Sequence, residues 1–556
     1  MTEFVRLGCV MIMRDLKVVC LASLLLYMSM TAAYAVDLEK YPLGINLNGI
    51  ADWSPEMPFL DLMKQARPWI PQRRNRPWGK GGMLILDEHG WVRTLEPRQW
   101  ADLIFLTVKQ PLPFTEFVVR YDGKGKIDYA GIARRIRRIR TGEDIVRVSQ
   151  KINGHAILRL LKTNPEDPVR NIRIIPIKYL SEYEKGEVFN PLWLKYVQRF
   201  RAIRFMDWMG TNGSDQDAWS RRPRPDDYTW QWRGVPLEIL VSLANRIHAD
   251  PWFNMPHKAN DDYIRNMALL VRTNLNKEST IYVEHSNEVW NWRFKQAHYA
   301  KEQAKSRWGR EGNHWMQWHG MRTATLCQIW KKIFSGEDSR IQCVLGIHPG
   351  WRGLEKAALE CPSWDKEGNG PCYRNGIDAI AITGYFTGCL DGNAGWKRPA
   401  RYETIRKWFA EPDGGMKKAF EQALDGRHFG CERTLKGVAD TISYFAAIAK
   451  SYGMSLLAYE GGQHVTGNGS KIQDDPAFIH FHLQFNRSEY MYTLTRKILE
   501  LWKENGGGLF MYYNDIYPAS KWGSWGAMDN LQDTGSPKIR AIRDFSKGRE
   551  CWWDGC

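Results

Sequence analysis

The 556-residue sequence lacks the short motifs of several common enzyme and binding classes. It contains no C-x-x-C pair, so a zinc ribbon or a thioredoxin-like site is not expected. No H-E-x-x-H motif places two histidines for a catalytic zinc ion, and no G-x-S-x-G motif supplies the nucleophile elbow of an α/β-hydrolase. No G-x-G-x-x-G motif opens a helix after a strand, which argues against a doubly wound dinucleotide fold. We therefore expect neither a metal ion nor a cofactor.

Long apolar runs are also missing after the first 40 residues, where no stretch approaches the ~18 apolar residues of a membrane span. The one sizeable apolar stretch, residues 18–28, follows the basic residues 13–17 and precedes the small-x-small site at 33–35. This order is typical of a cleavable secretory signal, with cleavage expected after Ala35. An uncleaved anchor is the alternative. We expect a secreted or periplasmic protein with no membrane span in the mature chain.

Cysteines support the same compartment. The sequence has 10, and Cys9 and Cys20 belong to the expected signal. The remaining even number in an oxidising compartment predicts disulfides. The pairs closest in sequence are Cys361 with Cys372 and Cys551 with Cys556. The sequence leaves the pairing open for Cys327, Cys343, Cys389 and Cys431.

Positive charge and tryptophan are abundant. Of the formal net charge of +16, a surplus of +9 (15 Lys or Arg against 6 Asp or Glu) lies in residues 120–178, most densely in 132–140. In an exported protein such a stretch favours an acidic polysaccharide or an anionic cell surface over nucleic acid. The alternative is a solvated basic face. The 26 Trp favour carbohydrate, because sugar rings stack on indole faces, although a large aromatic core explains them equally well.

The hydrophobic pattern divides the chain into two textures. Between about residues 82 and 177, short runs alternate with a period of two and are separated by turn residues, which predicts a small antiparallel sandwich. The clearest runs are 117–121, 145–148, 156–160 and 172–175.

After Ser181 single buried strands alternate with helical stretches, which is typical of parallel strands joined by crossover helices. Together with residues 43–47, these make eight strands, and eight favour a closed barrel over a doubly wound sheet. The predicted fold class is α/β, a (β/α)8 TIM barrel with a β-sandwich-like domain inserted between barrel strands one and two. The later strands are expected at 202–208, 251–257, 280–284, 341–346, 377–382, 455–459 and 508–513. The expected parts are the signal at 1–35, the first barrel strand and loop at 36–63, the inserted domain at 64–178 and the rest of the barrel at 179–556.

Two glutamates end strands on opposite sides of this barrel. Glu288 follows the fourth strand and Glu460 ends the seventh. Since barrel active sites lie at the carboxyl ends of the strands, the two face each other across the mouth, as two-carboxylate glycoside hydrolysis requires. Glu284, four residues earlier, is expected inside the barrel, paired with an Arg or Lys.

Ser286-Asn287-Glu288 after strand four, with Glu460 after strand seven, resembles the clan A retaining glycoside hydrolases. The resemblance covers about 41–63 and 180–545 and excludes the insert. It implies Glu288 as general acid/base and Glu460 as nucleophile. It further implies that Asn287 hydrogen-bonds the sugar 2-hydroxyl and that Tyr385 orients the nucleophile. Arg204 would be the basic residue of strand two, and Trp522 or Trp525 would lie under the sugar.

Other positions are candidates with less support. His257, at the end of strand three, is expected to recognise a sugar hydroxyl or else to be structural. Trp208 is counted with the substrate-binding residues, although Asp207-Trp208 and residues 459–464 match no known subfamily.

We therefore predict a secreted retaining glycoside hydrolase that cleaves a β-linked polysaccharide, an acidic one included. One alternative is a non-catalytic carbohydrate-binding protein on a glycosidase-like barrel. A polysaccharide lyase is a weaker alternative, which would need a Tyr or His base beside a carboxylate-neutralising Arg or Asn.

Overall fold

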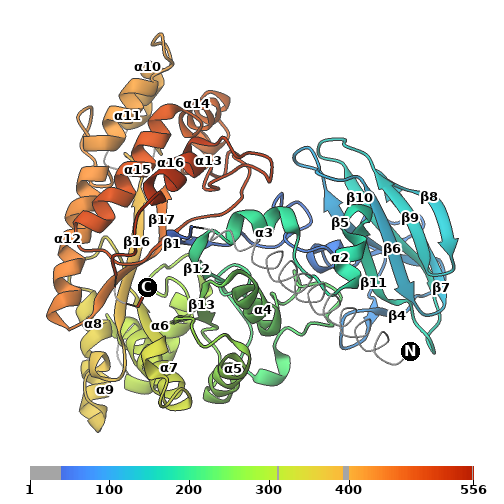
Figure 1. Cartoon of the computed structure of the whole chain (residues 1–556), viewed down its shortest axis with the longest axis horizontal. Helices are drawn as coiled ribbons and strands as arrows, with labels where there is room; N and C mark the ends of the chain where they lie inside the picture. The colour runs from blue at the N-terminus through green and yellow to red at the C-terminus, as the bar shows by residue number, and fades with distance from the viewer. Residues whose placement is uncertain (1–38, 310–311, 392–399, 554) are drawn as a thin grey trace, which may run out of the picture. The chain divides into compact units, whose positions relative to one another are not determined.

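Eight parallel strands close into a barrel in chain order (Figure 1). The computed structural model describes residues 39–556 except 310–311, 392–399 and 554, so the expected signal and its cleavage site lie outside the described residues. The predicted eight-stranded parallel barrel is confirmed. Its strands are β1 (Tyr41–Asn46), β12 (Phe200–Arg204), β13 (Asp250–Met255), β14 (Ile281–His285), β15 (Ile341–Gly346), β16 (Ala379–Phe386), β17 (Ser455–Gln463) and β18 (Phe510–Tyr512).

The strand ends differ from the expected ones where the site lies. β12 ends at Arg204, so Asp207 and Trp208 belong to the loop that follows. β16 and β17 run longer than expected, to Phe386 and Gln463. Large and small apolar side chains fill the barrel interior, as closure of eight strands requires. They are Ala202, Trp252, Tyr282, Val344, Ala379, Ala381, Leu457, Tyr459, Leu509 and Met511.

Helices connect the barrel strands, and the longer ones bury apolar residues against the barrel. α4 (Leu237–Ile247) begins after Pro236, buries residues three and four apart, and ends where His248 adopts a left-handed conformation. The Asn260 side chain accepts a hydrogen bond from the Tyr263 amide and caps the next helix. The other helices are α2 (Leu180–Glu184), α3 (Pro191–Val197), α5 (Asp261–Asn274), α6 (Lys295–Trp308), α7 (His314–Ile333), α8 (Glu355–Glu360), α9 (Pro362–Trp364), α10 (Ala400–Trp408), α11 (Met416–Asp425), α12 (Leu435–Ser451), α13 (Ser470–Gln473), α14 (Pro476–Asn486), α15 (Glu489–Glu504) and α16 (Pro537–Ser546).

Between β1 and β12 in the chain, ten strands form antiparallel sheets. One has the order β2-β5-β10-β7, a second the order β11-β6-β9-β8, and β3 pairs with β4. Side chains from both four-stranded sheets, among them Phe105, Phe117 and Leu158, share one hydrophobic cluster. That this segment is a separable domain with boundaries at 64 and 178 stays a prediction. The strands are β2 (Ile70–Arg73), β3 (Ile85–Leu86), β4 (Val92–Thr94), β5 (Gln99–Thr107), β6 (Glu116–Asp122), β7 (Gly125–Gly131), β8 (Ala133–Arg140), β9 (Glu143–Val148), β10 (His155–Thr163) and β11 (Arg170–Pro176).

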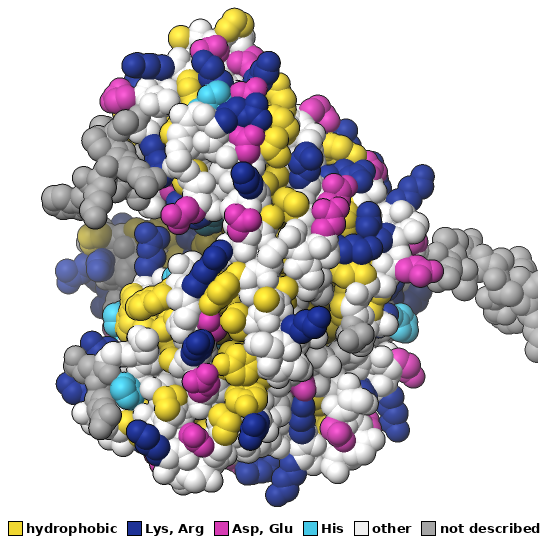
Figure 2. Space-filling model, turned by 90° about the vertical axis from the view of Figure 1, so that its left-hand side faces the viewer, with side chains coloured by type: hydrophobic (Ala, Val, Ile, Leu, Met, Phe, Trp, Pro, Cys, Tyr) yellow, Lys and Arg dark blue, Asp and Glu magenta, His cyan; other side chains and the backbone are white. Residues whose placement is uncertain are grey.

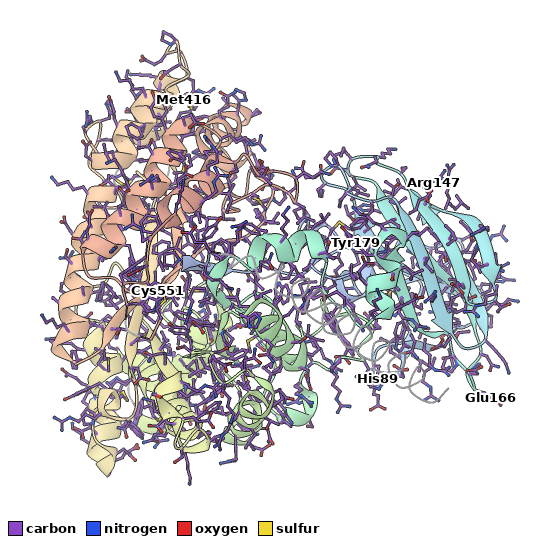
Figure 3. The ribbon with its side chains drawn as sticks, in the orientation of Figure 1. His89, Arg147, Glu166, Tyr179, Met416 and Cys551 are labelled. Atoms are coloured by element: carbon purple, nitrogen blue, oxygen red, sulfur yellow. A yellow bond between two sulfur atoms is a disulfide. The ribbon has the colours of Figure 1, made fainter. Side chains whose placement is uncertain are left out.

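The basic stretch at 132–140 forms the edge strand β8, and much of its charge is paired. Arg135 and Arg138 both contact Asp144 of β9, at 2.8 and 3.1 Å. Arg140 pairs with Glu143 at 2.8 Å. Arg147 on β9, labelled in Figure 3, pairs with Glu116 at 2.6 Å. Within the described part of the chain, Arg134 and Arg137 are the two β8 arginines without an ion pair.

Charge on the barrel is mixed rather than concentrated. Figure 2 views the molecule from the left-hand side of Figure 1 and shows Lys and Arg interspersed with Asp and Glu over that face. Among the described residues, no helix combines the length and apolar character needed to cross a membrane.

Three disulfides join six of the cysteines. Cys361–Cys372 and Cys551–Cys556 pair as expected from their proximity in sequence. The third, Cys389–Cys431, spans 42 residues. The remaining two described cysteines, Cys327 and Cys343, are buried thiols. Disulfides are typical of extracellular and periplasmic proteins.

Candidate active site

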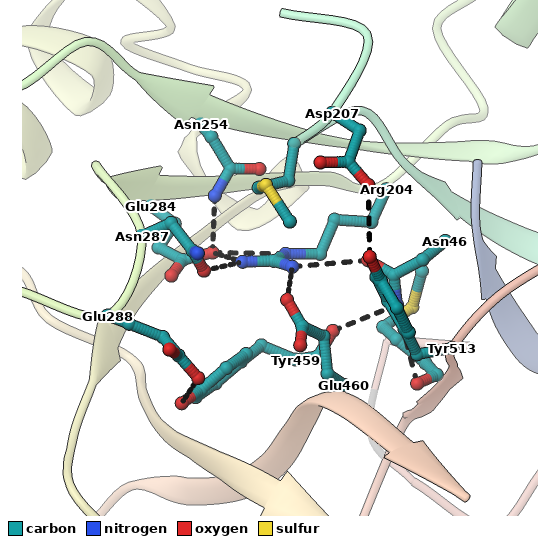
Figure 4. A network of polar contacts seen from close by, with 12 residues as sticks. Asn46, Arg204, Asp207, Asn254, Glu284, Asn287, Glu288, Tyr459, Glu460 and Tyr513 are labelled. Atoms are coloured by element: carbon teal, nitrogen blue, oxygen red, sulfur yellow. Dashed lines mark hydrogen bonds and ion pairs between the residues drawn. The ribbon is translucent and has the colours of Figure 1, made fainter. Parts of the chain in front are cut away.

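Arg204 is the centre of the polar network at the carboxyl ends of the barrel strands (Figure 4). Its guanidinium is completely buried and connects β12 with β1, β14 and β17. It donates to Glu284 at 2.8 Å, Asn287 at 2.9 Å, Glu460 at 3.0 Å and Asn46 at 3.1 Å. A planar fork of donors suits this task, because one side chain then orients several oxygens at once.

Glu284 is the permanent counter-ion of Arg204. Trp252 and Asn254 donate to the same Glu284 oxygen, at 2.9 and 2.7 Å. These contacts confirm the expectation that Glu284 is an interior carboxylate paired with a basic residue. A carboxylate held by so many donors is a poor nucleophile, which leaves Glu288 and Glu460 as the reactive candidates.

Glu460 reaches the site through an irregularity in β17. The pairing of β16 with β17 skips one residue, because Ile382 lies opposite Ala458 and Thr383 lies opposite Glu460. Tyr459 is thus the extra residue of a β-bulge, which re-aims the side chains that follow it. Tyr459 therefore fills the barrel interior while Glu460, next to it, still reaches Arg204.

The Glu460 carboxyl has two distinct hydrogen-bond partners. Arg204 binds one oxygen, and the Tyr385 hydroxyl donates to the other at 3.0 Å. Burial raises the pKa of Glu460 to about 7, and Arg204 and Tyr385 oppose that rise because they stabilise the charged form. Two donors aimed at the carboxylate hold it in one orientation, as a nucleophile needs.

Glu288 follows β14 on a tightly turned backbone. Ser286 and Glu288 both have positive φ, 62° and 42°, a conformation that costs energy in residues other than glycine. The half-buried Glu288 carboxyl accepts hydrogen bonds from Asn291 at 2.8 Å and Tyr459 at 3.2 Å. Burial and the nearby Glu460 charge raise the pKa of Glu288 to about 8. Glu288 is therefore the member of the pair that keeps its proton to higher pH.

Aromatic side chains form one wall beside the two glutamates. Tyr385 and Tyr513 contact edge to face at 6.3 Å, and Trp525 contacts Tyr513 at the same distance. The Trp525 indole N–H donates to His464 at 3.2 Å, which fixes the ring. The Tyr513 hydroxyl donates to Asp207 at 3.2 Å, and burial raises the pKa of Asp207 to about 6.

The structure brings together six of the residues expected in the site: Arg204, Asn287, Glu288, Tyr385, Glu460 and Trp525. Trp522 lies on the same loop as Trp525 but is 56% exposed and contacts Lys521 instead. The catalytic and binding roles of these seven residues stay predictions.

Two residues expected to bind substrate, Trp208 and His257, are buried. Trp208 is 1% exposed, stacks on Trp193 at 5.5 Å and donates to the Asn48 carbonyl, so its indole belongs to the core and has no free face for a sugar. His257 is 3% exposed and packs edge-on against Tyr299 at 5.1 Å. Burial lowers the pKa of His257 to about 4, so this ring is a neutral, enclosed residue rather than one open to the cleft.

Sequence analysis did not single out several members of the network. Asn46 ends the first strand, Asn254 lies on the third, and Tyr459 directly precedes Glu460. A search for polar residues at every strand end would have found Asn46. The same search would have found Tyr513, the last residue of the eighth expected strand. No local signal marks Asn212, because it lies in a loop and contacts a site residue, Asn287, that is far away in sequence.

One group among the described residues could hold a metal ion. The ligand atoms of His89, Asp226 and Asp227 lie within 4.8 Å of one another, and none of these residues belongs to the network around Arg204.

Comparisons with known proteins add little to this geometry. No protein-family model matches the chain, and neither does any curated protein. Among solved structures, the chain is similar to a Bacteroidetes-affiliated GH5 cellulase linked with a polysaccharide utilization locus, at 11% identity over 64% of this chain and 84% of that chain, with a TM-score of 0.28. It is also similar to a family 5 xyloglucanase from Paenibacillus pabuli, at 11% identity over 60% of this chain and 97% of that chain, with a TM-score of 0.30. A third is Xylanase10C from Cellvibrio japonicus, at 8% identity over 89% of this chain and 99% of that chain, with a TM-score of 0.27. With TM-scores this low, the assignment of the fold rests on the strand pairing alone.

Proposed function

We propose that the protein is a retaining glycoside hydrolase that cleaves a β-linked polysaccharide by double displacement. The observation that carries the proposal is the pair of glutamates, Glu288 in the loop after β14 and Glu460 in the second half of β17, each with its own set of donors. Two carboxyls in one site separate their pKa values, so one donates a proton while the other attacks. Glu288, with the higher pKa, is the acid, and Glu460, bound to Arg204, is the nucleophile.

In the first step, a Glu460 carboxylate oxygen attacks the anomeric carbon as the bond from that carbon to the glycosidic oxygen breaks. Glu288 gives its proton to the departing oxygen, which leaves as an alcohol. The product is a glycosyl ester on Glu460 and an ionised Glu288. The Asn287 side chain, held by Arg204 at 2.9 Å and donating to Asn212 at 3.1 Å, is positioned to bind the sugar 2-hydroxyl.

In the second step, Glu288 takes a proton from water while the water oxygen attacks the anomeric carbon. The ester bond breaks, Glu460 leaves as a carboxylate, and Glu288 is again protonated. Esterification removes the Glu460 charge that raises the pKa of Glu288, so the pKa of Glu288 falls and its carboxyl is ionised when it must act as a base. Two inversions at the anomeric carbon retain its configuration.

Export is part of the proposal. The disulfides support an extracellular or periplasmic location, where a polysaccharide substrate is accessible. The predicted signal at 1–35 is to be tested by sequencing the amino terminus of protein recovered from outside the cytoplasm.

The test uses Glu288→Gln and Glu460→Gln, with hydrolysis followed on a polysaccharide panel and on aryl glycosides. We expect each variant to lose at least about 100-fold in kcat, in keeping with loss of a general acid or a nucleophile. With a good leaving group, the Glu288 variant should accumulate a glycosyl-enzyme that azide rescues, whereas the Glu460 variant should accumulate none. Glu284→Gln is unsuitable as a control, because Glu284 holds Arg204. Glu500→Gln, which removes an α15 carboxylate paired with Arg496 at 2.9 Å, is the matched control.

Sugar binding by both wild type and variants without hydrolysis of any panel member would instead establish the non-catalytic alternative.

A further inference from the structure

A cleft of about 600 Å³ lies beside the loop that follows β12. The loop that follows β12, residues 207–234, supplies most of its lining. Two lining residues, Asp207 and Asn212, hydrogen-bond to Tyr513 and Asn287 of the site. Two residues of the cleft wall are therefore hydrogen-bonded to residues of the candidate site, and the cleft volume has room for sugar units.

Two arginines on its walls have no acidic partner. Arg224 and Arg233 both line the cleft, and the described part of the chain contains no ion pair to either. Among the described residues, the Arg224 side chain has one hydrogen bond, a long one of 3.4 Å to the Ser220 carbonyl. By contrast, the neighbouring Arg221 is paired with Asp217.

Arg233 is held in place by an aromatic contact. Its guanidinium lies 3.8 Å from the centre of the Trp232 ring, within the range of a cation–π contact. Trp232 packs in turn on Tyr228, with ring centres 5.9 Å apart. A guanidinium fixed in this way loses little side-chain entropy on binding, and its edge donors stay available.

Of the three acidic residues that line the cleft, Asp207 and Asp215 have close side-chain partners and Glu88 is exposed. Asp215 pairs with Lys258 at 2.7 Å, Asp207 accepts from Tyr513, and Glu88 lies 3.9 Å from the His89 ring. The nearby Asp227 is buried, and one of its oxygens accepts from the Arg224 amide. Arg224 and Arg233 are therefore the cleft arginines that form no ion pair with a described carboxylate.

We propose that this cleft is a subsite for an acidic sugar, whose carboxylate or sulfate is bound by Arg224 and Arg233. The inference rests on the proposed glycosidase function and names its substrate class. Arginine suits both anions, because its parallel N–H donors match two anion oxygens. The acidic group is then bound in the cleft and not at the β8 edge. On that edge, three of the five arginines are paired with Asp144 or Glu143.

The experiment measures binding by calorimetry in the Glu288→Gln background, where hydrolysis does not interfere. The probes are β-linked hexasaccharides of matched backbone in neutral, uronate-bearing and sulfated forms. We expect an acidic form to bind more tightly than the neutral one. The double variant Arg224→Gln/Arg233→Gln should reduce that acidic binding at least tenfold and change neutral binding less than twofold. The single variants, with thermal unfolding as a check, keep the test valid should the double variant fold poorly.

The matched control is Arg134→Gln/Arg137→Gln, which removes two unpaired arginines from β8. We expect it to leave the preference for acidic over neutral sugar unchanged. Loss of the preference in this control, equal losses on neutral and acidic probes in the cleft variants, or no preference in the parent would each overturn the inference. Comparing the uronate and sulfate arms identifies the anion. Hydrolysis of the panel by wild-type protein is scored separately, so failure of the glycosidase proposal is distinguishable from failure of the acidic subsite.

Discussion

Replacing Arg204 with Met tests the candidate site at its centre. The side chain is buried and holds Glu284 on one side and Glu460 on the other. Methionine keeps most of the volume and removes both the charge and all the hydrogen-bond donors. The variant should therefore be less stable and should need a higher pH for activity.

The stability cost follows from the carboxylate left behind. Removing one partner of a buried ion pair typically costs about 3–5 kcal/mol, because the other charge remains buried without compensation. Glu284 keeps its donors Trp252 and Asn254, so we expect the lower end of this range, about 3 kcal/mol. Urea unfolding followed by tryptophan fluorescence measures this difference as a shift in the midpoint.

The effect on activity follows from Glu460. Arg204 opposes the rise that burial imposes on the pKa of Glu460, so without Arg204 that pKa rises further above about 7. The nucleophile must be ionised, so the acidic limb of the kcat/KM profile moves to higher pH. At a pH below the limb, each unit of that movement lowers the rate about tenfold. A pH series with an aryl glycoside measures the limb.

The controls separate charge from packing. Arg204→Lys retains the charge, so its acidic limb should move less than that of Arg204→Met. Arg201→Met removes another β12 arginine, which pairs with Asp250 at 2.8 Å away from the site, and should leave the limb unmoved. An Arg204→Met protein that folds and keeps the wild-type acidic limb would refute the electrostatic role assigned to Arg204.

Three further predictions concern other parts of the molecule. Burial lowers the pKa of His319 from 6.5 to about 4, so the unfolded chain takes up a proton at a higher pH than the folded one. The free energy of unfolding should therefore fall as pH drops from 6.5 toward 4, by up to about 1.4 kcal/mol per pH unit. Urea unfolding at pH 6.5 and 5 should show a smaller loss in His319→Gln than in the wild type. Replacing Cys389 and Cys431 with Ser opens a loop of 42 residues and should cost about 4 kcal/mol, measured as the fall in unfolding free energy under non-reducing conditions, with reductant abolishing the difference from wild type. Trp525→Ala should lower kcat/KM on oligosaccharides about tenfold through loss of stacking, whereas Trp522→Ala should change it less than twofold, and equal effects would contradict the placement of Trp525 in the aromatic wall.

Local periodicity was enough to predict the barrel. A buried parallel strand is a short apolar run between turn signals, and eight such runs with helices between them have few alternatives to closure. The same pattern placed Glu288 and Glu460 at strand ends, because position along a strand is a property of the nearby sequence. Strand ends were less accurate: the apolar run through Phe205 continues past Arg204, where β12 stops.

Only the tertiary structure decided which side chains meet. Arg204 and Glu460 are 256 positions apart, and their contact exists because the barrel closes and brings β12 and β17 to one mouth. The bulge at Tyr459 is equally invisible in sequence, since simple alternation would point Tyr459 and Glu460 in opposite directions. Trp208 shows the converse, because an indole after a strand end is available to a sugar or enclosed by the core according to its neighbours, here Trp193 and Phe59.

The sequence by itself thus determined the fold class, the order of the strands and the two glutamates, all of which depend on interactions between residues near one another in the chain. The tertiary structure alone decided the partners of those glutamates, the pairing of Cys389 with Cys431, and the neutralisation of most of the β8 arginines by Asp144 and Glu143. The physical reason is that hydrogen bonds, ion pairs and disulfides act over a few ångströms in space, and folding sets those distances between residues that no local pattern relates.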